Sequence, residues 1–216
     1  MENLTEVVFI LDRSGSMAGL ENDTIGGFNS MLKKQQGNAE SKVFVSTILC
    51  NHESFVLHDR ISIDEVEPLT EKDYCVGGTT ALLDALGDAI KHVKNVYRYV
   101  RKKNRPQKVL FIITTDGEEN SSYKFTYREI KRLIEQQKTK DWEFIFMGAN
   151  IDAPEVAENI GIDRRRAVNY HADKIGTQKA YRAMNKAIED CCCCKCVAID
   201  DSWRKELDED FKKRKK

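Results

Sequence analysis

The sequence predicts an α/β fold, with a doubly wound, mostly parallel central sheet and helices on both faces. Two observations lead to this prediction. Short apolar runs, of the kind that form buried parallel strands, alternate along the chain with amphipathic segments of helical period. This alternation extends over most of the 216 residues, a length that suits one domain with a short appendage.

The first elements follow from local pattern. A strand is predicted over residues 7–11, and apolar residues at helical spacing predict a helix over residues 22–36. The apolar run 43–49 predicts a second strand, with residues 53–57 as its hairpin partner. Their connection is too short to hold a helix, so we expect this pair to be antiparallel and to form an edge of the sheet. Residues 61–73 are polar and are expected to form a surface connection.

A long helix is predicted from residue 81 to residue 100, where apolar positions alternate steps of three and four. Thr79 and Thr80 are its candidate N-caps, and Pro106 prevents its continuation. The basic run 101–105 suits the negative end of the helix dipole. We therefore interpret this run as a solvated helix end rather than a nucleic-acid site.

Three strands and three helices are predicted in the rest of the domain. The strands are expected at residues 109–113, 143–147 and 167–170, the last of them at an edge. The helices are expected after the candidate N-cap Thr126, at residues 153–159 and at residues 172–189. The residues expected on the inner face of the last helix are Ile175, Ala180, Met184, Ala187 and Ile188.

The chain is predicted to divide into a domain, residues 1–190, and a cysteine-rich, charged tail, residues 191–216. Five of the seven cysteines lie between Cys191 and Cys196. Their two Cys-x-x-Cys pairs overlap, so one Zn²⁺ ion would require a very sharp turn, and reactive or merely tolerated thiols are the favoured interpretation. An amphipathic helix is expected beyond them, and docking on the domain or binding a partner is favoured over disorder. Its apolar stripe consists of Trp203, Leu207 and Phe211.

Charge balance and apolar content limit the classes of function that the chain can have. There are 35 basic and 35 acidic residues, so the formal net charge is zero and gives no support to a nucleic-acid or membrane-surface role. No apolar run approaches the roughly 18 residues of a membrane span, and no leader pattern precedes the first strand. A cytoplasmic location with reduced thiols is the resulting expectation.

The turn after the first strand contains an acid and two hydroxyls, Asp12, Ser14 and Ser16, with Gly15 allowing a tight bend. In open α/β sheets, ligands bind beyond the carboxyl ends of the strands, and clustered oxygens suit a hard divalent cation. Two later stretches place further oxygens at the ends of elements. They are Gly77-Gly78-Thr79-Thr80 before the long helix and Thr114-Thr115-Asp116-Gly117 after the strand 109–113.

Together these stretches resemble the metal-ion-dependent adhesion site of von Willebrand factor type A (VWA, or integrin I-like) domains, specifically a small bacterial-type intracellular member. The resemblance covers roughly residues 5–190 and implies a Rossmann-like sheet with one antiparallel edge strand. It also implies a metal site. The implied ligands are Asp12, Ser14, Ser16, Thr80 and Asp116, with Thr79 as the alternative to Thr80.

The function that follows is a noncatalytic protein-interaction module. Mg²⁺ is the expected ion, with Mn²⁺ or Ca²⁺ as substitutes, and a partner's Asp or Glu carboxylate would complete its coordination. Family members often work with AAA-type ATPases, and such an ATPase would be a separate protein because the chain has no phosphate-binding loop of its own. Glu118 and Glu119 are expected to be solvated rim acids, and Arg13 to contact an acidic partner or solvent.

Two alternatives remain open from sequence. One is a Mg²⁺-dependent phosphohydrolase resembling the haloacid dehalogenase superfamily, with Asp12 as its nucleophile. That family has a second Asp two residues after the first, where this chain has Ser14, and no suitable lysine is assigned. The other is a scaffold whose metal site is vestigial.

Overall fold

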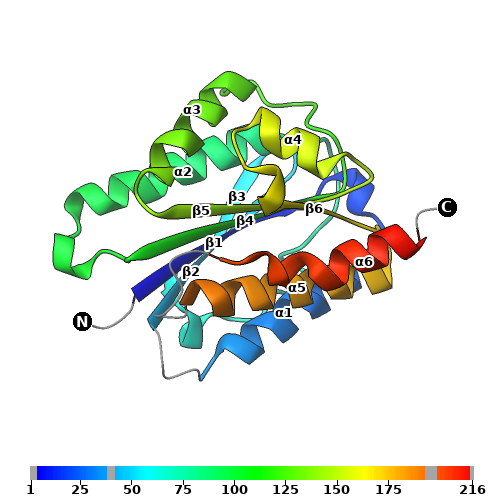
Figure 1. The fold of residues 1–216 in the computed structure, drawn as a ribbon, viewed down its shortest axis with the longest axis horizontal. Coiled ribbons are helices and arrows are strands. Elements are labelled where there is room, and N and C mark those ends of the chain that lie inside the picture. The colour runs from blue at the N-terminus through cyan, green and yellow to red at the C-terminus, as the bar shows by residue number, and fades with distance from the viewer. Residues whose placement is uncertain (1–3, 38–41, 193–198, 215–216) are drawn as a thin grey trace.

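The computed structural model describes residues 4–37, 42–192 and 199–214, and its central feature is a six-stranded sheet of order β3-β2-β1-β4-β5-β6 (Figure 1). All neighbouring strands are parallel except β3, which runs antiparallel to β2 at one edge. The predicted fold class is therefore confirmed. The strands are β1 (Leu4–Asp12), β2 (Lys42–Cys50), β3 (Ser54–Ser62), β4 (Lys108–Thr115), β5 (Trp142–Ala149) and β6 (Ala167–Tyr170).

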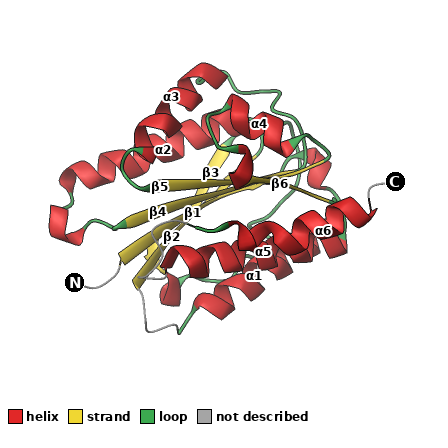
Figure 2. Ribbon diagram, viewed as in Figure 1, coloured by secondary structure: helices red, strands yellow, loops and turns green. Residues whose placement is uncertain are grey.

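Helices cover both faces of the sheet (Figure 2). Successive side chains of a strand point to opposite faces, so Phe9 and Leu11 of β1 join the core beneath α1, α5 and α6, whereas Val8 and Ile10 join the core beneath α2, α3 and α4. This is why the first strand reads as an unbroken apolar run. The helices are α1 (Glu21–Gln35), α2 (Leu82–Tyr99), α3 (Tyr127–Lys138), α4 (Ala153–Asn159), α5 (Lys174–Cys192) and α6 (Lys205–Arg214).

The connection after β3 differs from its prediction. The strand β3 extends to Ser62, beyond the expected hairpin partner 53–57, and the following segment buries Val66, Leu69 and Tyr74 in the core below α1. These apolar residues are spaced irregularly and show neither a period of two nor one of 3.6. Periodicity alone therefore could not distinguish this buried strap from a surface loop.

The start of α2 also differs from its prediction. Its N-cap position is Ala81, which offers no side-chain cap, and the backbone N–H of Leu83 donates to Glu119 Oε2 at 2.9 Å. Neither Thr79 nor Thr80 caps this helix. The expected cap of α3 is confirmed, since Thr126 forms a reciprocal capping box with Glu129.

The tail docks on the domain, one of the two outcomes expected for it. Trp203 and Leu207 are buried in the core that α5 and β6 share with α6. Phe211, the third residue of the predicted stripe, is half-buried and stacks on His171 with ring centroids 4.8 Å apart. Ile175 was expected on the inner face of α5, but it lies in the first turn of the helix and is 54% exposed.

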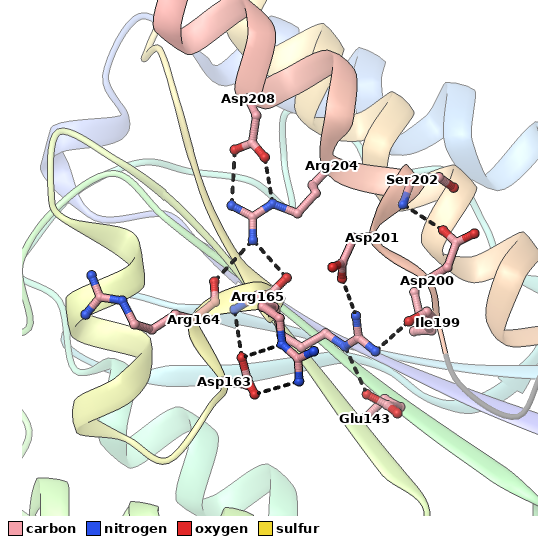
Figure 3. A network of polar contacts seen from close by, with 11 residues as sticks. Glu143, Asp163, Arg164, Arg165, Ile199, Asp200, Asp201, Ser202, Arg204 and Asp208 are labelled. Atoms are coloured by element: carbon pink, nitrogen blue, oxygen red, sulfur yellow. Dashed lines mark hydrogen bonds and ion pairs between the residues drawn. The ribbon is translucent and has the colours of Figure 1, made fainter.

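Arginines anchor the start of the tail (Figure 3). Arg204 donates through Nη1 to the backbone carbonyls of Arg164 and Arg165, at 3.1 and 2.8 Å, and pairs with both carboxylate oxygens of Asp208 through Nε and Nη2. Arg166 contacts Asp201 at 3.2 Å from the segment before β6. The tail is thus linked to the β5–β6 side of the domain by polar contacts as well as by buried apolar side chains.

Two adjacent glycines of α1 give a matched test of this packing. A Cβ at Gly27 would lie 2.2 Å from Cδ2 of Tyr181 on α5, whereas a Cβ at Gly26 would meet nothing within 4 Å. We expect Gly27→Ala to lower the free energy of unfolding by about 1–3 kcal/mol through overpacking. Gly26→Ala should raise it by about 0.5–1 kcal/mol, because alanine is the better helix former. Urea unfolding of both variants checks this, and equal shifts would contradict a tight α1–α5 contact.

Candidate metal centre

The site lies at the carboxyl ends of the two central strands. In the parallel register Leu11 of β1 pairs with Thr114 of β4, so Asp12 and Thr115 come next to one another at the same edge. Asp12 is only 1% exposed. Its Oδ1 accepts the Ser14 N–H at 2.7 Å, and its Oδ2 accepts the Thr115 hydroxyl at 2.6 Å. The carboxylate is therefore fixed from both sides.

A chain of oxygens leads from the first turn to the second acid. The hydroxyls of Ser14 and Ser16 are 3.0 Å apart, and Ser16 donates its hydroxyl proton to Asp116 Oδ1 at 2.5 Å. Gly117 lets these turns approach, since a Cβ there would lie 3.1 Å from Ser16 Oγ. The structure thus brings four predicted ligands, Asp12, Ser14, Ser16 and Asp116, into one cluster.

The loop with the two threonines is tied to the first turn through its backbone. Gly15 N–H donates to the Gly78 carbonyl at 2.9 Å, and Gly77 N–H donates to the Arg13 carbonyl at 2.9 Å. Gly78 has φ of +77°, a conformation that favours glycine. Thr80 is 3% exposed, whereas Thr79 is exposed. Because Thr80 is buried where this loop meets the first turn, Thr80 is favoured over Thr79 as the ligand. The choice between them stays a prediction.

The two acids sit in an electrostatically unfavourable environment. Burial, the largest cause, raises the pKa of Asp12, and burial also raises the pKa of Asp116, to which the nearby Asp12 charge adds. The Oδ2 atom of Asp116 is buried without a hydrogen-bond partner in the described part of the chain. Arg13 does not offset these charges, because its guanidinium is directed to the Asp73 carbonyl and the Phe55 ring.

The donor set fits a hard divalent cation. The two serine hydroxyls and two carboxylates are oxygen ligands of the kind that Mg²⁺ takes. A cation or a water bound to it would also give the unpartnered Asp116 oxygen a partner. Within the described ranges, no three His, Cys, Asp or Glu side chains gather in a way that could hold a metal. A metal site here therefore depends on the hydroxyls.

Comparison with known protein families identifies the domain to which these strand-end residues belong. The model of the von Willebrand factor type A domain matches residues 6–183. The chain belongs to this family. The VWA match ends inside α5, and the docked tail lies beyond it. The domain division at residue 190 remains a prediction. No curated protein sequence matches the chain.

Solved structures share the VWA fold at low sequence identity. The PilB minor pilin from Streptococcus sanguinis is 12% identical, with a TM-score of 0.60 over 88% of this chain and 62% of the pilin. The ArnB paralog VWA2 from Sulfolobus acidocaldarius is 20% identical, with a TM-score of 0.55 over 87% and 45%. Proximal thread matrix protein 1 from the mussel byssus, with a zinc occupied MIDAS motif, is 15% identical, with a TM-score of 0.56 over 85% and 45%. The chain thus spans about half the length of these VWA proteins.

Residues that support this VWA site were missed or misjudged from sequence. Glu119 is not a freely solvated rim acid, because its carboxylate accepts the N–H groups of Leu83, Ser121 and Ser122. Asp84 in α2 is 5% exposed and accepts three successive backbone N–H groups of the loop 123–125. Both acids order the segment after Asp116. Only folding brings Glu119 to Leu83 and Asp84 to the loop 123–125, so local sequence contained no signal for these long-range contacts.

The cysteine cluster falls largely outside the described residues, and the prediction for its overlapping pairs stays untested. Cys191 and Cys192, at the end of α5, are buried in the core, and burial raises the pKa of the Cys191 thiol to about 12. A thiol protonated at neutral pH is a poor nucleophile and a poor metal ligand.

Among the helices of the described segments, none combines the length and apolar character needed to cross a bilayer.

Proposed function

We propose that this chain is a divalent-cation-dependent protein-interaction module that binds a carboxylate of a partner protein. The observation that supports this best is the fixed oxygen cluster Asp12–Ser14–Ser16–Asp116, with its unpartnered acid oxygen. Thr80 completes the proposed ligand set. Mg²⁺ is the proposed ion, with Mn²⁺ or Ca²⁺ as substitutes, and its chemistry is to act as a Lewis acid toward an incoming oxygen.

The roles of the protein residues follow from their contacts. Asp12 is held by Ser14 and Thr115, so it supplies negative charge at a fixed place. Ser14 and Ser16 offer neutral oxygens, which leave the bound ion with more of its positive charge. A partner's Asp or Glu side chain would meet that charge at the strand ends.

A hydrolase role for Asp12 has less support. A nucleophilic carboxylate needs one oxygen directed at the substrate, but both oxygens of Asp12 accept hydrogen bonds and the residue is almost fully buried. We therefore propose a noncatalytic function. A partner from an AAA-type ATPase system and a cytoplasmic location belong to the same proposal, as does the bacterial-type character of the domain.

Calorimetric titration of metal-free protein with Mg²⁺ and Mn²⁺ tests the metal site. Wild type is expected to bind one ion, and Asp12→Ala or the double variant Ser14→Ala/Ser16→Ala should weaken binding by roughly 10–100-fold. Asp88→Ala is the matched control, because this partly exposed aspartate on α2 pairs with Lys124 and is not a candidate metal ligand. Circular dichroism checks that each variant is folded.

Two results would contradict the proposal. Equal metal binding by wild type and a folded Asp12→Ala variant would leave the protein as a scaffold with a vestigial site. Mg²⁺-dependent hydrolysis of p-nitrophenyl phosphate that is abolished in Asp12→Asn would instead restore the phosphohydrolase alternative.

A further inference from the structure

A groove of about 320 Å³ adjoins the metal centre between the start of α2, the start of α3 and the start of α4. Thr115 and Gly117, which flank Asp116, line it, and the Thr115 hydroxyl donates to Asp12 Oδ2. A ligand bound at the metal centre would therefore extend directly into this groove. Apolar side chains also line it, among them Leu83, Ile151 and Val156.

The rim of the groove is acidic. Glu118, Asp152 and Glu155 are exposed along it, and none of the residues that line it is basic. Among the described residues no side chain forms an ion pair with the carboxylate of Glu118 or Glu155. Arg164, which also feels Asp152 and Glu155, is already paired with Glu158 at 2.8 Å. The residues that line the groove thus have a surplus of negative charge.

Tyr127, at the first position of α3, contributes an aromatic face to the same groove and is 40% exposed. Burial raises the pKa of its hydroxyl, and the charges of Glu119 and Glu118 raise it further, as expected in a region of negative potential. An aromatic ring beside carboxylates attracts a cationic group. The groove thus combines apolar residues, an acidic rim and an aromatic ring. These features together are complementary to a side chain with an aliphatic stem and a positively charged end.

We propose that this acidic groove binds a lysine or arginine side chain of the same partner polypeptide whose carboxylate meets the metal centre. The proposal rests on the proposed function and specifies its partner. The aliphatic stem of the side chain would cover Leu83 and Val156, and its charged head would lie among Glu118, Asp152 and Glu155. The module would thus recognise an acidic and a basic residue together.

The selectivity of this arrangement follows from charge. A second acidic residue at the groove would be repelled by the rim carboxylates, and a purely apolar side chain would leave them unpaired. A basic side chain gains attraction without moving any residue of the site. The metal centre and the groove would therefore select opposite charges at neighbouring positions of the partner.

Selection of phage-displayed random peptides tests the proposal. Phage are bound to immobilised wild-type protein in Mg²⁺ and eluted with EDTA, so that only metal-dependent binders are sequenced. The expected peptides contain an Asp or Glu with a Lys or Arg enriched at a fixed spacing from it. The best synthetic peptide should bind Glu118→Gln/Glu155→Gln protein roughly tenfold more weakly than wild type.

The controls separate the two proposals. Glu135→Gln, an exposed acid of α3 outside the groove, should leave peptide affinity unchanged. Peptides that elute with EDTA and contain an acid but show no basic enrichment would overturn the groove proposal and leave the proposed function standing. Failure to recover any EDTA-eluted peptide, with Mg²⁺ binding intact, would overturn both.

Discussion

Replacing Trp203 with alanine is expected to lower the free energy of unfolding by about 3–5 kcal/mol. Trp203 is 2% exposed and belongs to the same apolar cluster as Val168 of β6 and Ile188 of α5. Truncation to Cβ removes the buried indole and leaves a cavity between the tail and the domain. The polar contacts at the start of the tail cannot offset this loss, because partly exposed ion pairs contribute only about 0–1 kcal/mol each.

Urea unfolding followed by the fluorescence of Trp142 measures this effect. The chain has two tryptophans, and Trp142 lies in β5, where it stacks on Phe111 with centroids 5.5 Å apart. Loss of Trp203 therefore leaves a probe inside the sheet. If the urea midpoint reported by Trp142 fluorescence is lowered, the tail and the domain unfold as one unit.

The control is Tyr99→Ala, which removes an aromatic side chain that is 90% exposed and should change stability by less than about 0.5 kcal/mol. If Trp142 fluorescence reports the same urea midpoint for Trp203→Ala and wild type, the tail adds nothing to the stability of the sheet. The tail would then be a separate appendage, as the division at residue 190 implies.

The sheet and the clustering of four candidate metal ligands were predictable because their signals are local. An unbroken apolar run such as residues 7–11 is typical of a strand buried on both faces, and parallel strands place their carboxyl ends at one edge. The acids that follow two central strands, Asp12 and Asp116, must therefore meet. In the structure Ser16 donates its hydroxyl proton to Asp116, and Ser14, whose hydroxyl is 3.0 Å from that of Ser16, donates its backbone N–H to Asp12.

Other features could not be predicted because they depend on contacts between distant loops. The N–H groups at the start of α2 have no local cap, and the acid that accepts one of them, Glu119, is 36 residues away from Leu83. The acidic groove likewise combines Glu118 with Asp152 and Glu155, which follow different strands. Neither arrangement leaves a periodic or turn pattern in the sequence.

The second large effect is expected at Glu6, a carboxyl group buried inside the sheet. Its side chain is 0% exposed, Oε2 accepts from Arg60 Nε at 2.9 Å and from the Tyr97 hydroxyl at 2.5 Å, and Oε1 has no partner in the described part of the chain. Burial raises the pKa of Glu6, and the contacts with Tyr97 and Arg60 lower it only in part. Among the described residues, Arg60 is the cation that forms an ion pair with this buried carboxylate.

The sign of the pH dependence follows from this raised pKa. Between the unfolded and folded pKa values of Glu6, the folded state binds more protons than the unfolded state, so the stability that protonation contributes is lost as pH rises through the folded pKa. Arg60→Met removes the compensating charge and should raise the pKa of Glu6 further. We expect it to lower the free energy of unfolding by about 3 kcal/mol at neutral pH, where removal of one partner strands a buried charge.

Urea unfolding at about pH 5 and about pH 8 tests this expectation, with a smaller loss predicted at the lower pH because Glu6 is then more readily protonated. Methionine retains an apolar stem for the Phe44 and Tyr97 rings, over which the Arg60 guanidinium lies at 5.6 and 5.3 Å from the ring centroids. In a Glu6→Gln background the same Arg60→Met change should cost much less and lose its pH dependence, because no buried anion remains. An equal cost in both backgrounds would show instead that Arg60 stabilises the sheet by packing, and that its charge is not needed to keep a carboxylate inside β1.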